Sequence, residues 1–291
     1  MPVSRPSAHA PTVDDVIDVH ASLRHVRPLV QCLTNAVSAN FVANVLLAAG
    51  AAPAMVDNPE EAAGFAQVAA AVLINLGTPT GAQVQSMRLA AETADRAGKP
   101  WVLDPVGAGG LPWRGGVAAE LLAFKPVIVR GNASEIIGLA GLGGGTRGVD
   151  GSDEPAKAVG AATNLLDHAG AVSASGPVDH VIGRVAVADG GSVPVLVRIA
   201  GGSALLPRVT ATGCSLGALM AAYAAVSADA LLAATAAHVH FAVAAERAEA
   251  RSQGPGSFAP AFLDALDAID ADAIRKHSRI EVQAGDARPY R

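Results

Sequence analysis

Short, continuous apolar runs alternate with segments of helical periodicity between residues 13 and 175. The apolar runs predict strands over residues 29–33, 52–56, 71–76, 101–103, 127–129 and 171–175. The segments between them predict helices over residues 13–26, 35–50, 58–70, 80–97, 114–123 and 156–168. Strands that are apolar throughout are typical of a parallel sheet with helices on both faces, so the pattern indicates an α/β fold.

The pattern changes beyond residue 175. Strands over 180–188 and 193–200, on either side of Gly190 and Gly191, are predicted to pair antiparallel. Helices are predicted over 214–228, 229–247 and 260–269. We expect residues 13–270 to form a single domain, with a Gly-rich loop over 141–154, a disordered tail over 1–12 and a polar, fraying C-terminal tail over 271–291.

The composition restricts the classes of partner. Hydrophobic residues make up 51% of the 291 residues and aromatic residues only 3%, so a large core must be built from Ala, Val, Leu and Ile. The net charge of −5, without a basic patch, argues against nucleic acid. Cys32 and Cys214 are too few for a disulfide framework, which favours a cytoplasmic protein. The Ala-rich run 214–228 is shorter than the ~20 residues of a membrane-spanning helix, so no membrane contact is expected.

Polar residues stand where the predicted parallel strands end, namely Asn75, Asp104, Arg130 and Asn132. In parallel sheets, ligands bind at the carboxyl ends of the strands. Asp104 precedes a Gly-rich stretch and is a candidate magnesium ligand, although an Asp in this position also caps turns.

The run from Arg130 to Glu135 allows two interpretations that can hold together. Arg130 is suited to clamp phosphate oxygens, and Glu135 could join Asp104 around a metal ion. Alternatively, Asn132 and Glu135 form a capping box at a helix start.

The residues from Ala211 to Cys214 form a small-residue turn that leads into an Ala-rich helix. Free backbone N–H groups at such a turn make an anion site that suits a phosphoryl group. A thiol at this place is expected to have a lowered pKa. The alternative is a buried Cys that only begins a helix. The chain has no P-loop motif and no protein-kinase signature. His238 and His240 stand two residues apart in a predicted helix and make a poor metal pair.

Taken in order, these motifs resemble those of the hydroxyethylthiazole kinases of the ribokinase-like superfamily. The matching stretches are Gln31-Cys32-Leu33-Thr34-Asn35 with Asn40 and Asn44, Ala54-Met55, Asn75-Leu76-Gly77-Thr78, Asp104-Pro105-Val106-Gly107-Ala108-Gly109, Arg130-Gly131-Asn132-Ala133-Ser134-Glu135, Gly148-Val149-Asp150, Thr212-Gly213-Cys214 and Gly254-Pro255-Gly256-Ser257-Phe258. The resemblance extends from about Leu29 to Leu266.

This resemblance implies a three-layer α/β/α fold with a mostly parallel sheet, a homotrimer with thiazole sites between subunits, and transfer of phosphate from ATP with Mg²⁺. Residue by residue it implies thiazole contacts from Met55, Asn35 and Gly213, and ATP contacts from Arg130 and Ser175. It implies magnesium-site acids at Asp104 and Glu135, and catalytic roles for Gly213 and Cys214.

Ser175 and Ala211 differ from the usual residue of the family, and Cys214 differs from the sugar kinases of the wider superfamily. Ser175 stands where Thr is more frequent, and Cys214 where sugar kinases of the superfamily carry an Asp that accepts the hydroxyl proton. We expect Cys214 to assist proton transfer without being indispensable. Ala211 replaces the usual Gly and is strained if its φ is positive. The alternatives are a kinase for another small alcohol, such as a hydroxymethylpyrimidine or a pyridoxal-like compound, a cysteine hydrolase built on Cys214, and a non-catalytic thiazole-binding protein.

Overall fold

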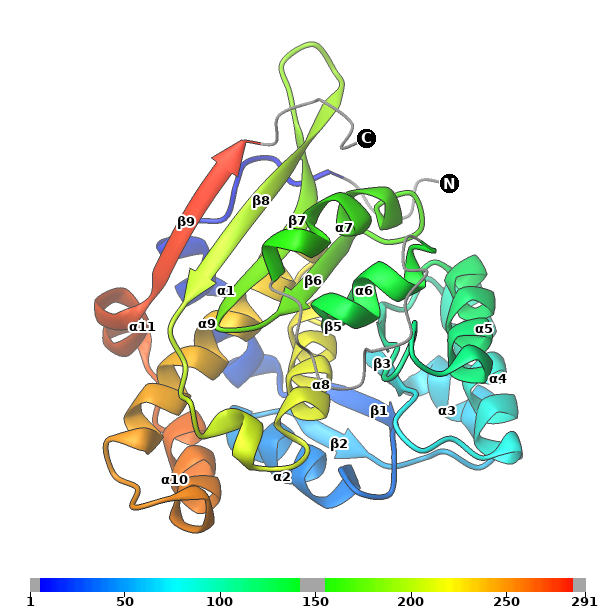
Figure 1. Cartoon of the computed structure of the whole chain (residues 1–291), viewed down its shortest axis with the longest axis horizontal. Helices are drawn as coiled ribbons and strands as arrows, with labels where there is room; N and C mark the ends of the chain where they lie inside the picture. Colours follow the sequence, from blue (N-terminus) through cyan, green and yellow to red (C-terminus); the bar gives the residue numbers. More distant parts are fainter. Residues whose placement is uncertain (1–5, 142–154, 285–291) are drawn as a thin grey trace.

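The computed structural model describes residues 6–141 and 155–284. A twisted nine-stranded sheet runs through this part of the molecule (Figure 1). The strands are β1 (Leu29–Leu33), β2 (Ala52–Ala54), β3 (Ala71–Asn75), β4 (Trp101–Asp104), β5 (Ile128–Asn132), β6 (Ala171–Ser175), β7 (Val178–Ala186), β8 (Ser192–Ala200) and β9 (Arg279–Ala284). Their order in the sheet is β2-β1-β3-β4-β5-β6-β7-β8-β9. The first six in this order run parallel, whereas β7, β8 and β9 are added antiparallel.

Helices cover both faces of this sheet. One layer contains α1 (Val13–Val26), α2 (Ala39–Ala49), α8 (Thr212–Ala224), α9 (Ala230–Glu249), α10 (Pro255–Asp267) and α11 (Ala271–His277). The other contains α3 (Ala62–Val68), α4 (Gly81–Ala97), α5 (Pro112–Leu121), α6 (Ala133–Leu139) and α7 (Val159–Leu165). Short 3₁₀ helices span Leu122–Phe124, Pro155–Ala158 and Leu206–Arg208. The predicted three-layer α/β/α fold with a mostly parallel sheet is confirmed.

The apolar strands supply both cores at once because successive side chains point to opposite faces of a strand. Val72 and Ile74 of β3 join the core under α4, and Leu73 joins the core under α8 and α9. Both faces of the strand are therefore dry, which explains why the parallel strands read as unbroken apolar runs.

Local signals fix several element boundaries where the sequence predicts them. The helix over Val13–Val26 and the strands over Leu29–Leu33 and Ala171–Ser175 have the predicted bounds. Thr80 forms a capping box with Gln83 at the start of α4, and Gly50 ends α2 in the left-handed region. The other elements differ from prediction by a few residues at their ends. The predicted loop over 141–154 lies outside the described residues, apart from Gly141.

The structure differs from the sequence prediction at both ends of the chain. Where a fraying tail is predicted from residue 271, α11 packs on α1 and α9, and β9 pairs with β8 along six residues. Within the predicted N-terminal tail, Ser7 is buried and bridges to Val185 of β7. The pairing partners of these two segments lie far away in the sequence. The polar character of the segments themselves therefore wrongly suggests disordered tails.

Among the described helices, none combines the length and the apolar character that crossing a bilayer requires.

Candidate active site

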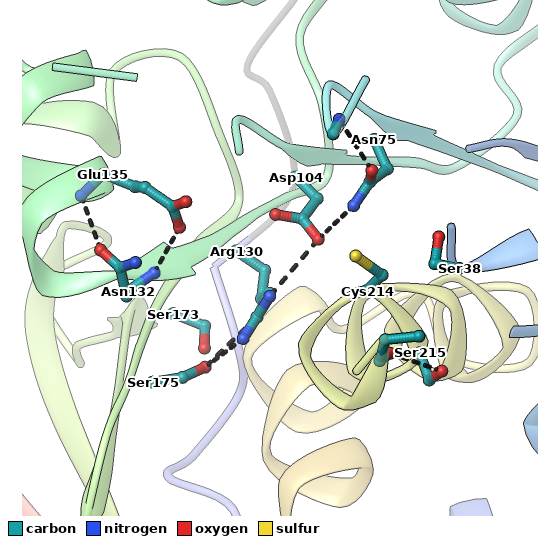
Figure 2. Close-up of polar contacts among 12 residues, drawn as sticks. Ser38, Asn75, Asp104, Arg130, Asn132, Glu135, Ser173, Ser175, Cys214 and Ser215 are labelled. Carbon is teal, nitrogen blue, oxygen red and sulfur yellow. Dashed lines mark hydrogen bonds and ion pairs between the residues drawn. The ribbon is translucent and has the colours of Figure 1, made fainter. Parts of the chain in front are cut away.

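Polar side chains from adjacent parallel strands meet at the carboxyl edge of the sheet (Figure 2). Asn75 ends β3 and donates from Nδ2 to Oδ2 of Asp104, which ends β4, over 2.7 Å. Arg130 of β5 donates from Nη1 to the same oxygen over 3.3 Å. The Nε and Nη2 of Arg130 both donate to Ser175 Oγ at the end of β6, each over 3.2 Å. The parallel topology thus assembles one continuous polar chain from residues that are 100 positions apart.

Asp104 is fully buried, with no exposed surface. Burial raises the pKa of Asp104 to about 7, and the charge of Glu135 adds to this, while Arg130 and Asn75 act in the opposite direction. Its Oδ1 has no hydrogen-bond partner among the described residues. A buried carboxylate oxygen without a protein partner is suited to a hard cation, so Asp104 fits a magnesium ligand.

Glu135 has a structural role that the sequence also predicts. Its Oε2 accepts from Asn132 N over 2.8 Å, and Asn132 Oδ1 accepts from Glu135 N over 2.9 Å, which completes the capping box of α6. Its Oε1 accepts from Gly107 N over 2.9 Å and thereby holds the Gly-rich loop after β4. Each carboxylate oxygen keeps further acceptor capacity, so capping does not prevent contact with a metal-bound water.

The described residues contain no group of three or more His, Cys, Asp or Glu side chains placed to hold a metal ion. A divalent cation beside Asp104 would therefore need ligands from elsewhere. Mg²⁺ is commonly held by one or two carboxylates together with the phosphates of a substrate and water. The donor set here fits an ion that arrives with a nucleotide.

The N-terminus of α8 approaches the Asp104–Arg130 pair closely because two glycines face it. A Cβ on Gly213 would lie 3.2 Å from both Nη atoms of Arg130. A Cβ on Gly217, one turn later, would lie 3.4 Å from Asp104 Oδ2. The positive end of a helix and a guanidinium group therefore converge at one place, which suits a phosphate or another anion.

Ala211, the residue before α8, adopts the left-handed conformation with φ 72° and ψ −5°. Its carbonyl oxygen accepts from Ser215 N and Ser215 Oγ, both over 2.8 Å, so the first turn of α8 fixes this conformation. The condition under which Ala211 is strained, a positive φ, is therefore met. An L-residue with a Cβ is disfavoured there by about 1–2 kcal/mol, which a glycine would avoid.

Cys214 lies in the first turn of α8, partly buried, and its Sγ accepts from Asn35 Nδ2 over 3.4 Å. Burial raises the pKa of the Cys214 thiol, and the nearby Asp104 charge adds to it, whereas Asn35 and Arg130 act in the opposite direction. The predicted lowering of this pKa is therefore wrong. The loss of water around the sulfur outweighs its position at the helix N-terminus.

Asn35 begins the turn between β1 and α2. Its Nδ2 donates to Asn75 Oδ1 over 2.8 Å as well as to Cys214, and its Oδ1 accepts from Ser38 N over 3.0 Å. This turn delays the start of α2 to Ala39, four residues after the predicted start. Asn35 is thereby joined to the polar chain that ends at Ser175.

The sequence-predicted residues fall into two places. Asn35, Asp104, Arg130, Ser175, Gly213 and Cys214 come together, and Glu135 lies beside them through Gly107 and Asn132. Met55 follows β2 at the edge of the sheet, on the other side of β1 from Asn75, with 38% of its surface exposed. Sequence reasoning placed Asn75 at a strand end without giving it a role. Its central position depends on contacts 40 and 29 residues away.

Sequence comparison assigns most of this chain to one family. The model of the hydroxyethylthiazole kinase family matches residues 20–272. A hydroxyethylthiazole kinase of Rhodococcus erythropolis is 60% identical over 270 residues, which cover 93% of this chain and 95% of the relative. A hydroxyethylthiazole kinase of Acinetobacter baumannii is 45% identical over 271 residues, covering 93% of this chain and 96% of the relative.

Structural comparison agrees with this assignment. The solved hydroxyethylthiazole kinase protein of Pyrococcus horikoshii superposes with a TM-score of 0.82 at 36% identity, over 93% of this chain and 99% of the other. A pyridoxal kinase of Staphylococcus aureus superposes with a TM-score of 0.62 at 16% identity, over 89% of this chain and 99% of the other, which shows the shared ribokinase-like fold alone. The chain belongs to the hydroxyethylthiazole kinase family.

Proposed function

We propose that this protein transfers the terminal phosphoryl group of ATP to the primary hydroxyl of 4-methyl-5-(2-hydroxyethyl)thiazole. The product is the thiazole phosphate that thiamine diphosphate synthesis uses in salvage. Family membership supports the reaction. The observation that carries the proposal is the convergence of Arg130, Asp104 and the N-terminus of α8 at one point of the sheet edge. Phosphoryl transfer depends mainly on such positioning and charge stabilisation.

At the donor end, Arg130 binds phosphate oxygens and Ser175 orients its guanidinium group through two hydrogen bonds. Asp104, whose Oδ1 has no partner among the described residues, and Glu135 would hold Mg²⁺. When bound, Mg²⁺ would neutralise the negative charge that develops on the phosphates. Asp104 also contacts Arg130, so it would hold the cation close to the guanidinium group.

At the acceptor end, the free N–H groups of the first turn of α8, beginning at Gly213, stabilise the transferring phosphoryl group. Met55 and Asn35 contact the thiazole. The thiolate form of Cys214 accepts the hydroxyl proton, and because the pKa of the thiol is raised this form is a minor one near neutral pH. Cys214 therefore assists proton transfer without being indispensable, in keeping with a loose transition state in which the hydroxyl loses its proton late.

The active form is proposed to be a homotrimer in the cytoplasm. Four large apolar side chains are exposed in the part of the chain from the β1–α2 turn to the end of α3, namely Val37, Leu47, Met55 and Val68. Exposed apolar side chains can mark subunit contacts, and a contact at β2 would place Met55 between subunits. Light scattering after size exclusion tests this assembly, and a monomer at micromolar concentration contradicts it. Both cysteines are free in the structure, in keeping with a reducing compartment.

The test of the reaction is ADP release by the purified protein with ATP and Mg²⁺. Hydroxyethylthiazole, a hydroxymethylpyrimidine, pyridoxal and sugar alcohols are compared as acceptors. Thiazole-dependent ADP release is expected. If ADP is released only with another alcohol, that alcohol is the substrate and the proposed thiazole is not. Thiazole binding without ADP release would indicate a binding protein. Chelation of Mg²⁺ should abolish the reaction.

A further inference from the structure

Asn75 is buried to 99% at the end of β3, and its carboxamide contacts three groups. Its Oδ1 accepts from Asn35 Nδ2 over 2.8 Å and from Gly77 N over 3.0 Å. Its Nδ2 donates to Asp104 Oδ2 over 2.7 Å. Figure 2 shows the Asn75 side chain next to Asp104, with Cys214 close to both. Asn75 therefore lies between the donor end and the acceptor end of the site.

These contacts allow only one orientation of the Asn75 amide. Rotated by half a turn, its NH₂ would oppose the N–H groups of Asn35 and Gly77, and its oxygen would oppose a carboxylate oxygen of Asp104. In a buried site each such mismatch leaves a polar group without a partner, which disfavours the rotated orientation. The backbone N–H of Gly77 is fixed by the chain, so it sets the polarity of the whole arrangement.

At the donor end, this polarity decides which oxygen of Asp104 is free. Oδ2 accepts from both Asn75 and Arg130, while Oδ1 is left without a partner among the described residues. Rotation of the carboxylate would exchange the two oxygens, and the hydrogen bond from Asn75 opposes it. Asn75 thereby presents one defined oxygen to a cation.

At the acceptor end, the same amide holds Asn35. One N–H of Asn35 Nδ2 is directed to Asn75 Oδ1 and the other to Cys214 Sγ. Gly77 packs against this side chain so tightly that a Cβ on Gly77 would lie 2.3 Å from Asn35 Nδ2. The missing side chain of Gly77 is therefore a requirement for the position of Asn35, independent of Asp104.

We propose that Asn75 is a positioning residue that aligns the cation-binding oxygen of Asp104 with the hydroxyl-binding group of Asn35 and Cys214. This inference rests on the proposed function and adds a residue that acts at both ends of the reaction. It follows that damage to Asn75 affects both ends, whereas damage to Gly77 affects only the acceptor end.

The experiment compares Asn75→Leu, in which the side chain keeps the same number of heavy atoms and loses all polar contacts, with Gly77→Ala. Asn164→Leu is the matched control, since Asn164 is exposed on α7 in the opposite helix layer. Two binding constants are measured on the full chain. Calorimetry gives the Kd of hydroxyethylthiazole without nucleotide, and electron paramagnetic resonance gives the Kd of Mn²⁺ with a non-hydrolysable ATP analogue.

Asn75→Leu is expected to raise the thiazole Kd about tenfold and the Mn²⁺ Kd at least about fivefold, equivalent to about 1 kcal/mol or more at each end. Gly77→Ala is expected to raise the thiazole Kd alone. The control should match the wild type in both. Wild-type values in a folded Asn75→Leu protein, or a Mn²⁺ effect of Gly77→Ala as large as its thiazole effect, would overturn the proposal. A wild-type protein that binds no thiazole would instead contradict the proposed function.

If Asn75→Leu does not fold, Asn75→Asp provides the second variant. An Asp there still accepts from Asn35 and Gly77, but it places a second carboxylate against Asp104, so that charge repulsion or a shared proton replaces the hydrogen bond from the amide. The thiazole Kd should stay within about twofold, and the Mn²⁺ Kd should shift at least about threefold. Buried Cys32 reports folding in each sample, because it resists alkylation in the native protein. Equal changes in both constants would overturn the proposal.

Discussion

Buried polar side chains at the sheet edge and in the α9 layer are satisfied to different degrees. In the α9 layer, His238 uses both ring nitrogens, with Ser173 Oγ at 2.6 Å and Asp179 Oδ2 at 2.8 Å. His240 also uses both, with Tyr223 Oη at 2.9 Å and the Leu266 carbonyl at 3.0 Å. At the sheet edge, Asp104 is equally buried, yet its Oδ1 has no partner among the described residues.

This difference in hydrogen bonding distinguishes buried polar groups that stabilise the fold from those that are available to bind a ligand. A buried polar group whose partners all come from the fold contributes to packing and to the unique native state. A buried carboxylate oxygen without a partner is a destabilising feature that a bound cation or a proton relieves. His20, which packs edge-on against His240 with ring centroids 4.8 Å apart, also has an unpartnered nitrogen, but burial keeps this ring neutral. An uncharged nitrogen is far less costly than a carboxylate.

The largest expected effect is on catalysis, from Asp104→Asn. Removal of the charge that holds the cation should lower kcat/KM about 10²–10³-fold, as loss of a preorganised charge at a transferring group does. Steady-state ADP release measures this, and a thermal melt confirms that the variant is folded at the assay temperature. The control is Asp264→Asn on α10, where the side chain is exposed. A loss below tenfold would show that Asp104 is as structural as the histidines.

The next effect concerns stability in the α9 layer. Burial lowers the pKa of His20 from 6.5 to about 4 and that of His240 to about 3. Below pH 6.5 the unfolded chain therefore binds protons that the folded chain does not, so stability is complete above pH 6.5 and falls toward pH 4. At pH 5 the loss is about 2 kcal/mol for each histidine.

Denaturant unfolding at pH 5, 6, 7 and 8 measures this loss, with His240→Gln as the test and His25→Gln as the control, since His25 is exposed near the end of α1. His240→Gln should be less stable at pH 8 because Tyr223 loses a partner, but its stability should fall less between pH 7 and pH 5. An unchanged slope in His240→Gln would contradict the assignment of the pH dependence to this ring.

A smaller effect is expected from Cys214→Asp. The Cys214 thiol is mostly protonated near neutral pH because its pKa is raised, whereas an ionised carboxylate accepts the hydroxyl proton more readily. Turnover should therefore be preserved or rise by up to about tenfold. Cys214→Ser is the matched control, since it keeps the size of the side chain and is no base. A large loss of kcat in Cys214→Asp, with unchanged thiazole affinity, would exclude a base-like role.

The smallest effect is expected from Ala211→Gly. Glycine relieves the strain at φ 72° but adds freedom to the unfolded chain, so the net gain in stability should be about 0.5–1 kcal/mol. Denaturant unfolding measures it, with Ala250→Gly at the C-cap of α9 as a control that should be destabilised. A destabilised Ala211→Gly variant would show that this backbone is not strained.

The parallel half of the sheet was predictable because its signals are local. Each strand is an apolar run between polar ends, and Asn132 with Glu135 reads as the capping box that the structure shows. β9 was not predictable, because Arg279, Glu281 and Gln283 give it a polar character that only its pairing with β8 explains. An edge strand with one solvated face has no run of apolar residues to detect.

The residues that form the site were predictable from the sequence, but the hydrogen bonds between them were predictable only in part. Asp104 ends β4, Arg130 is the third residue of β5 and Cys214 lies in the first turn of α8, close to the carboxyl edge of the sheet, where chemistry is expected in this fold. The pKa of Cys214 was predicted with the wrong sign because helix position is visible in the sequence and burial is not. The hydrogen bonds of Asn75 join residues at the ends of three strands, and no pattern within a single segment predicts them.

The ribosome translates the two halves of the sheet at different times. Translation of the strands β1 to β6 is complete at Ser175. Ser7, in contrast, cannot form its hydrogen bonds until Arg184 and Asp229 have been translated; it donates to them over 2.8 and 2.6 Å. The edge of β8 stays open until β9 has left the ribosome. A nascent chain that pauses before Arg279 therefore carries a long, unpaired strand edge, which is the kind of surface that recruits chaperones or joins other chains.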